Sequence, residues 1–156
     1  STRFNPNLYV NGKICLSILG TWQGPGWSST MNIRTVINSI QGLVMNETPI
    51  INEPAYENTS LDNKVNYNYY VEYHSINYAL CEQLLNIHQH QPFDKLKDKL
   101  VNYFLKYSDN LLTRLDKLIE TRQLKPVTCA YVSVNDKYDY IKLKQKVIDM
   151  IDKIKK

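Results

Sequence analysis

Apolar side chains recur at helical spacing in the first third of the chain, and this pattern predicts a helix over about residues 30 to 45. Ser28, Ser29 and Thr30 precede it and are residue types that cap helix N-termini. The apolar positions form one stripe, which we expect to pack behind the segment around Cys15. The stripe consists of Ile33, Val36, Ile37, Ile40, Leu43 and Val44.

Helical periodicity returns after an irregular stretch that follows Thr48-Pro49 and runs to Ser60. A long helix is expected from about Val65 to Gln89, and Gln91-Pro92 should end it, because proline disfavours helix in the residue before it. Its expected apolar face consists of Tyr69, Tyr73, Ile76, Leu80, Leu84 and Ile87, with Tyr70 and Cys81 near it.

The remaining apolar pattern predicts three helices and one extended segment. Two helices are expected between Phe93 and Pro126, broken near Ser108-Asp109. Residues 127 to 134 should form a strand or a buried extended piece, and Tyr138 to Ile154 a final amphipathic helix. The expected apolar face of that helix consists of Ile141, Val147, Ile148, Ile151 and Ile154.

The loop-like start of the chain carries the main chemical candidate, a cysteine near asparagine side chains. Asn5-Pro6-Asn7 is followed by an Asn11-Gly12 turn signal, and Cys15 comes eight residues after Asn7. A chain that reverses at this turn brings Asn7 toward Cys15, where an amide N-H can stabilise the charge that a thiol's acyl chemistry creates. The alternative is that Cys15, flanked by Ile14 and Leu16, is a small buried hydrophobic residue.

Several sequence motifs follow one another in the order and spacing of a known family. FNPNLYVNGKICLSILGTW comes first, the helix-like VINSIQGL follows at residues 36 to 43, and NEPAYE lies at residues 52 to 57. In this order they resemble the catalytic half of a ubiquitin-conjugating enzyme. The family's usual His-Pro-Asn reads Asn5-Pro6-Asn7 here. The resemblance looks closest to the branch of very large enzymes that combine conjugating and ligase activity, including the BIR-repeat enzyme.

The resemblance implies an α+β fold, namely the C-terminal, catalytic half of the conjugating fold, mostly α-helical and extended by extra C-terminal helices. It divides the chain into residues 1 to 64 as the catalytic segment, 65 to 125 as C-terminal helices, and 126 to 156 as a strand-like piece with the terminal helix. The family's N-terminal helix and sheet precede the motif, yet only four residues precede Asn5. We therefore expect apolar surfaces that need either a partner chain or a rearranged packing.

The resemblance also implies roles for individual residues. Cys15 would carry ubiquitin as a thioester, and a substrate lysine would attack it. Asn7 would serve the oxyanion or order the loop; a turn-capping role is its alternative. Glu53, before Pro54, matches the family's acidic residue that assists the incoming lysine, although most surface carboxylates are merely solvated.

Asn5 would shape the loop where the family has histidine, and Asn52 and Tyr56 are lesser candidates beside Glu53. Trp22 is expected to pack in the core, and Trp27 either to pack or to face a ligase.

The resemblance implies ubiquitin, an activating enzyme, a ligase and protein substrates as partners. The alternative function is an inactive conjugating-like module that binds ubiquitin or a ligase. No cofactor is expected, because ATP is used by the activating enzyme. No metal is expected either, since His88 and His90 are two residues apart and point to different sides of a helix.

Composition changes this picture little. With 156 residues, 43% hydrophobic and 22% charged, the chain suits a globular domain, and its net charge of +4 comes mainly from C-terminal lysines that suit a solvated helix face. Nucleic acid is not expected as a partner, because these lysines suit a solvated helix face. A membrane is not expected either, since no apolar run approaches the ~18 residues that a span requires. Three separated cysteines fit no disulfide framework, so we expect a cytoplasmic protein, with the nucleus as the alternative.

Overall fold

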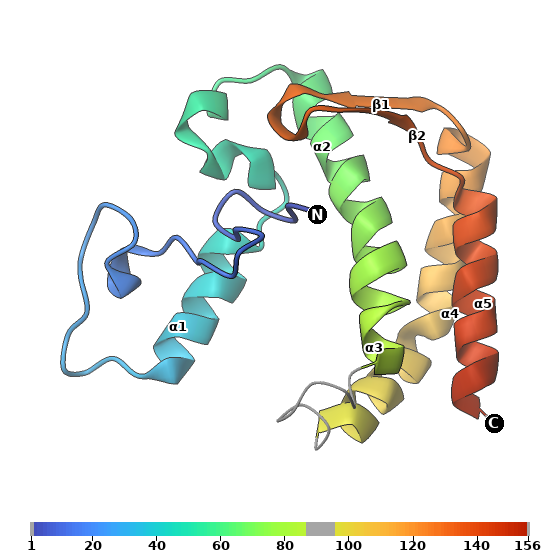
Figure 1. Ribbon diagram of the computed structural model, residues 1–156, viewed down its shortest axis with the longest axis horizontal. Coiled ribbons are helices and arrows are strands. Elements are labelled where there is room, and N and C mark those ends of the chain that lie inside the picture. The colour runs from blue at the N-terminus through green and yellow to red at the C-terminus, as the bar shows by residue number, and fades with distance from the viewer. Residues whose placement is uncertain (1, 87–95, 156) are drawn as a thin grey trace. The chain divides into compact units, whose positions relative to one another are not determined.

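The computed structural model describes residues 2–86 and 96–155 (Figure 1). Its contacts divide the chain into two compact units. Unit 1 consists of Ser1–Val71 and Thr128–Val134, and unit 2 of Glu72–Val127 and Asn135–Lys156. Unit 1 is thus completed by a segment from late in the sequence. The domain boundaries expected from the sequence, at 64/65 and 125/126, stay predictions.

The first helix of unit 1, α1, spans Ile33–Ser39 and continues as a π-helical turn over Ile40–Val44. Its N-cap is Asn32, whose Oδ1 accepts from the Arg34 N-H at 2.9 Å, while the Thr35 hydroxyl accepts from the Asn32 N-H. These reciprocal bonds form a capping box, which satisfies donors that the first turn leaves unpaired. The expected helix is confirmed, but the expectation that Ser28 to Thr30 cap it is wrong.

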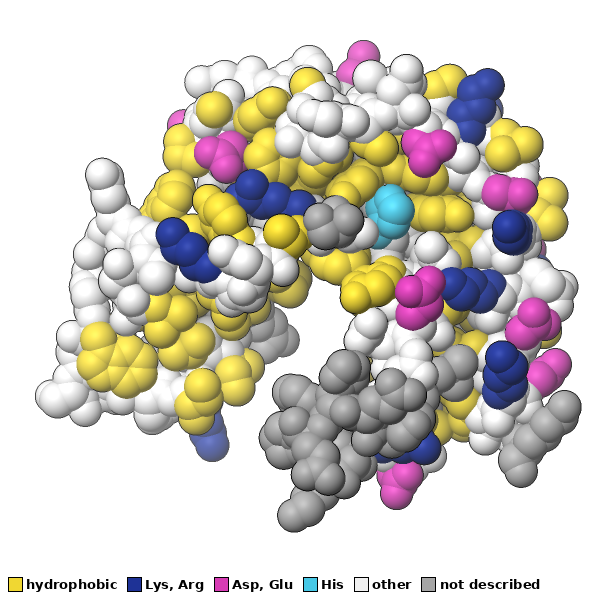
Figure 2. All heavy atoms as spheres, viewed as in Figure 1, with side chains coloured by type: hydrophobic (Ala, Val, Ile, Leu, Met, Phe, Trp, Pro, Cys, Tyr) yellow, Lys and Arg dark blue, Asp and Glu magenta, His cyan; other side chains and the backbone are white. Residues whose placement is uncertain are grey.

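The expectation that the apolar stripe of this helix packs behind the Cys15 segment is also wrong. Ile33 is 72% exposed, and Ile37 and Leu43 are exposed as well, whereas Val44 at the end of the stripe is buried. Trp22, expected in the core, is 46% exposed, and Trp27 is exposed too. Apolar side chains therefore lie open on the surface of unit 1, and Figure 2 shows hydrophobic side chains at the molecular surface.

Three short 3-10 turns complete the first part of unit 1, at Ser17–Leu19, Pro49–Asn52 and Pro54–Tyr56. The last two fall in the stretch expected to be irregular, and prolines begin both of them. Ile50 in the middle turn has no exposed surface, so this stretch is anchored in the core although it lacks regular structure.

The long helical segment is nearly continuous: α2 spans Leu61–His74, a π-helical turn covers Ser75–Leu80, and α3 spans Gln83–Asn86. It begins four residues before the expected start at Val65. Its expected end at Gln91-Pro92 lies outside the described residues, as do His88, His90 and Phe93.

The buried face of α2 begins with Tyr67 and Tyr70, not with the expected Tyr69 and Tyr73. The reason is that residues up to Val71 belong to unit 1 and those from Glu72 to unit 2, so this helix serves two cores in succession. One apolar stripe along the whole helix therefore does not predict which of its residues are buried.

Unit 2 contains α4, an unbroken helix over Lys97–Arg122. The break expected near Ser108-Asp109 is therefore wrong. The Ser108 hydroxyl donates to the Leu105 carbonyl at 2.9 Å, and the Thr113 hydroxyl donates to the Asp109 carbonyl at 2.9 Å. Because these polar side chains bond to the helix's own backbone, they are accommodated inside it.

A small antiparallel sheet follows, in which β1 spans Pro126–Cys129 and β2 spans Val134–Lys137. The expected extended piece at 127 to 134 is thus half strand and half loop, with a 3-10 turn at Ala130–Val132. The final helix, α5, spans Tyr140–Lys155, close to the expected bounds. Gln123 caps it, because its Oε1 accepts from the Tyr140 N-H at 2.8 Å.

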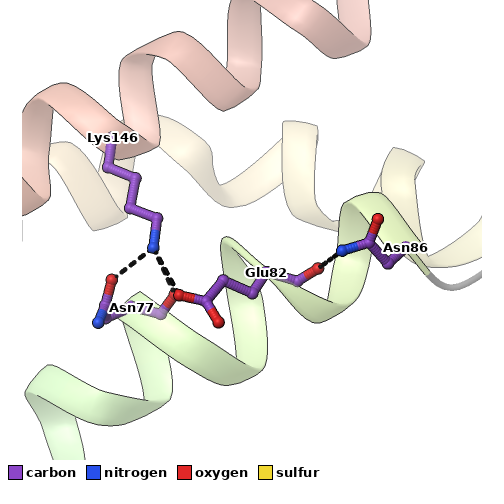
Figure 3. A network of polar contacts seen from close by, with 4 residues as sticks. All are labelled: Asn77, Glu82, Asn86 and Lys146. Carbon is purple, nitrogen blue, oxygen red and sulfur yellow. Dashed lines mark hydrogen bonds and ion pairs between the residues drawn. The ribbon is translucent and has the colours of Figure 1, made fainter.

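The core of unit 2 lies mainly between α4 and α5. Leu115 and Leu118 of α4 and Val147 of α5 are almost completely buried, whereas Ile141, expected on the apolar face of α5, is exposed. Lys146 of α5 contacts the helical segment between α2 and α3. Its Nζ donates to the Asn77 Oδ1 at 2.7 Å and pairs with the Glu82 carboxylate at 2.8 Å (Figure 3).

The fold is α+β, with helices predominating. Across residues 2–86 and 96–155, no helix combines the length and the apolarity that crossing a bilayer requires. The same residues contain no group of three or more histidine, cysteine, aspartate or glutamate side chains that suits a metal ion.

Candidate active site

A hairpin-like loop positions Asn7 beside Cys15. The Cys15 N-H donates to the Asn7 carbonyl at 2.8 Å, and the Tyr9 N-H donates to the Lys13 carbonyl at 2.9 Å. Gly12 closes the turn with φ of 88°, a left-handed conformation that favours glycine, and its N-H donates to the Tyr9 carbonyl. The turn signal read from Asn11-Gly12 is therefore confirmed.

The Asn7 side chain reaches across this loop, where its Nδ2 donates to the Cys15 carbonyl at 2.8 Å. Asn7 and Cys15 are thus joined by two hydrogen bonds: the backbone N-H of Cys15 donates to the Asn7 carbonyl, and the side-chain amide of Asn7 donates to the Cys15 carbonyl. The structure therefore gives Asn7 a loop-ordering contact. Its oxyanion role stays a prediction, because the amide donor is occupied by a backbone carbonyl here.

Asn5 is buried to 2% exposure and links the loop to the end of the first helix. Its Nδ2 donates to the Val44 carbonyl at 2.7 Å, and its Oδ1 accepts from the Asn7 N-H at 2.8 Å. Asn52 also donates to the Val44 carbonyl, at 3.3 Å. One carbonyl therefore joins the Asn5-Pro6-Asn7 loop, the helix end and the segment before Glu53.

Thr21 is a site residue that sequence reasoning missed. Its hydroxyl donates to the Ile14 carbonyl and accepts from the Leu16 N-H at 3.0 Å, so it holds the peptides on both sides of Cys15. The signal available in the sequence was weak: a hydroxyl residue directly after Gly20, which ends a 3-10 turn with φ of 66°.

Cys15 is a free thiol whose side chain is only 3% exposed. An acyl group must reach the sulfur for any transfer to occur, so this burial requires the surrounding loop to open. It also matches the alternative interpretation of Cys15 as a small buried hydrophobic residue.

Glu53 lies between the second and third 3-10 turns and is half-buried. Across the described ranges 2–86 and 96–155, no hydrogen bond joins its side chain to Cys15 or Asn7. Its carboxylate lies near Tyr131, whose pKa is raised to about 12, first by burial and further by the negative charge of Glu53. Asn7 and Cys15 are therefore brought together, whereas Glu53 is placed in a neighbouring cluster.

Comparisons with known proteins find matches for the part of the chain that contains Cys15. The family model described as ubiquitin-conjugating enzyme matches residues 1–76, which include the Cys15 loop and α1. Residues 1–76 of the chain therefore carry the sequence of the ubiquitin-conjugating enzyme family.

The relatives differ in how much of the chain they share. The ubiquitin-conjugating enzyme E2 Z of Xenopus tropicalis is 45% identical over 111 residues, covering 70% of this chain and 34% of that protein. A probable ubiquitin-conjugating enzyme E2, R521 of Acanthamoeba polyphaga mimivirus, is 32% identical over 169 residues, covering 99% of this chain and 10% of that protein.

The human dual E2 ubiquitin-conjugating enzyme/E3 ubiquitin-protein ligase BIRC6, which represents the hybrid branch, is 37% identical over 95 residues, covering 55% of this chain and 2% of that protein. The chain spans about a third or less of the length of these relatives.

Proposed function

We propose that this chain carries ubiquitin as a thioester on Cys15 and transfers it to a substrate lysine. The family match of residues 1–76 supports ubiquitin as the cargo, and an activating enzyme, a ligase and protein substrates as partners. The observation that carries the proposal is the pair of hydrogen bonds between Asn7 and Cys15, because it fixes an amide next to the only cysteine within the family match.

The proposed reaction has two acyl exchanges. In the first, the Cys15 thiolate attacks the carbonyl carbon of the thioester on the activating enzyme; a new C–S bond forms, the old one breaks, and the activating enzyme's thiolate leaves. In the second, a neutral lysine amine attacks the Cys15 thioester, a C–N bond forms, and the Cys15 thiolate leaves. The amine's proton passes to solvent or to a nearby base.

The chain's own residues need to supply orientation and charge stabilisation, because a thioester is already activated toward amines. Asn7 would keep the Cys15 peptide in place and, once the loop opens, offer its amide to the oxyanion. Glu53 would assist the loss of a proton from the attacking lysine amine, a role that requires the substrate lysine to approach Cys15 from the side of the Pro54–Tyr56 turn.

A charging assay tests the proposal. The chain, an activating enzyme, ATP and ubiquitin are run on a non-reducing gel beside Cys15→Ala, with Cys81→Ala as the matched control from unit 2. We expect an adduct of one ubiquitin that thiols cleave, that is lost in Cys15→Ala and that persists in Cys81→Ala. An adduct retained in Cys15→Ala, or none with the unmodified chain, would contradict it.

The burial of Cys15 favours one alternative, an inactive conjugating-like module that binds ubiquitin or a ligase. It is distinguished by titrating isotope-labelled ubiquitin with the chain and following ubiquitin's amide resonances. Saturable shifts from a chain that forms no thiol-sensitive adduct would support the binding module and exclude the transfer reaction.

A further inference from the structure

The loop between β1 and β2 lies in unit 1, although it comes long after the family match ends at residue 76. Unit 1 takes in Thr128–Val134, so this loop packs with the residues that hold Cys15. Its central aromatic residue is Tyr131, in the 3-10 turn Ala130–Val132. A segment without a match to the family model thus contributes to the unit that contains the candidate site.

Tyr131 packs against two tyrosines of unit 1. Its ring meets the Tyr67 ring edge to face, with centroids 5.4 Å apart, and the Tyr56 ring in the same way at 5.2 Å. Tyr67 is completely buried. Such edge-to-face pairs fix ring positions more firmly than apolar burial alone, so the Tyr131 ring has a defined place.

Arg3 connects Tyr131 to the Asn5-Pro6-Asn7 loop. The Arg3 Cζ lies 4.1 Å from the centroid of the Tyr9 ring and 5.3 Å from that of Tyr131, both within the range of cation–π attraction. The Arg3 Nη2 then donates to the Pro6 carbonyl at 2.8 Å. The guanidinium is therefore held by two rings while it bonds to the motif.

The backbone of Arg3 is fixed as well. The Tyr67 hydroxyl donates to the Arg3 carbonyl at 3.1 Å, and the Arg3 N-H donates to the Tyr70 hydroxyl at 3.3 Å. With its backbone held by α2 and its side chain held by the two rings, Arg3 cannot easily turn away from the Pro6 carbonyl.

The ring of Tyr131, and not its hydroxyl, makes these contacts. The hydroxyl oxygen is buried and has no hydrogen-bond partner among the residues that the structure describes. Phenylalanine at this position would therefore keep the ring contacts and remove a buried polar atom, whereas leucine would remove the electrostatic attraction of this ring for Arg3 and leave that of Tyr9.

We propose that Tyr131 is a positioning residue for the candidate active site: through Arg3 it holds the Asn5-Pro6-Asn7 loop, and with it the peptide of Cys15. The loop between β1 and β2 is then part of the site. The consequence for catalysis rests on the proposed function, whereas the consequence for the Cys15 loop does not.

Amide hydrogen exchange tests the positioning itself, without ubiquitin. Tyr131→Leu is compared with Tyr131→Phe and with the matched control Tyr103→Leu, which alters an exposed tyrosine of α4. We expect the Cys15 N-H, which bonds to the Asn7 carbonyl, to exchange roughly tenfold faster in Tyr131→Leu only. The Val147 N-H of α5 serves as the reference for general destabilisation.

Three results would overturn the proposal: unchanged exchange at Cys15 in Tyr131→Leu, equal acceleration at Val147, or the same acceleration in Tyr131→Phe. A second measurement follows the discharge of the Cys15 thioester to free lysine, which we expect to slow by roughly five- to tenfold in Tyr131→Leu and to recover in Tyr131→Phe. A chain that never charges contradicts the proposed function, and the exchange result then decides the positioning alone.

Discussion

Replacing Asn5 by alanine removes two hydrogen bonds at once. The Asn7 N-H loses its acceptor, and the Val44 carbonyl loses its shortest donor but keeps the Asn46 N-H at 3.1 Å and the Asn52 Nδ2 at 3.3 Å. A buried group left without a partner costs about 1–3 kcal/mol; here the part-buried Asn7 N-H loses its partner, and the buried Val44 carbonyl keeps only its two longer bonds. We therefore expect opening of the Cys15 loop to become about 2–3 kcal/mol easier.

The buried thiol of Cys15 provides the assay, because it reacts with an alkylating reagent only when its loop opens. Labelling of Cys15, identified by peptide mass spectrometry, should be roughly 30- to 150-fold faster in Asn5→Ala, since about 1.4 kcal/mol corresponds to a factor of ten. Asn11→Ala is the matched control, because Asn11 is exposed and its Oδ1 accepts one exposed N-H, that of Lys13. Equal labelling rates in the two variants would refute the reasoning.

Three further expectations concern other parts of the chain. Thr21→Val should speed labelling of the Cys15 thiol by roughly tenfold, because the bonds to the peptides beside it are lost, whereas Thr21→Ser should retain protection. Leu115→Ala should destabilise unit 2 by about 2–5 kcal/mol in thermal unfolding followed by circular dichroism; a loss below about 1 kcal/mol would contradict the core described for α4. Burial raises the pKa of Cys81 from 9.0 to about 11, so its contribution to stability is complete below pH 9 and is lost as the pH rises toward 11. Between pH 9 and pH 11, the free energy of unfolding should therefore depend less on pH in Cys81→Ala than in the unmodified chain, as measured by chemical denaturation.

Local patterns in the sequence predicted those helices whose apolar side chains mostly pack into one core. The final helix was placed within two residues of its observed start at Tyr140, because most of its apolar positions, though not Ile141, face a single core. α2 was harder, since it changes from one core to another near Val71. The strand Val134–Lys137 was missed because most of its residues are exposed and polar, so it shows no apolar alternation.

In the candidate site, too, contacts between near neighbours in the sequence were predictable and contacts between distant segments were not. The approach of Asn7 to Cys15 was predictable, because a turn at Asn11-Gly12 brings near neighbours in the sequence together. The contacts that hold this loop were not, because the carbonyl of Val44 and the ring of Tyr131 come from distant segments. The burial of Cys15 was the alternative that its apolar neighbours Ile14 and Leu16 offered, and the structure agrees with it.

The discontinuity of unit 1 has a consequence for protein synthesis. Residues up to Val71 leave the ribosome before α4 does, yet the unit is completed only by Thr128–Val134, after the whole of α4 has been made. Contacts between distant segments form late and leave apolar surface open in the meantime. The nascent chain therefore passes through a period in which the Cys15 loop lacks the ring of Tyr131, and a chaperone that binds exposed apolar segments would meet it then.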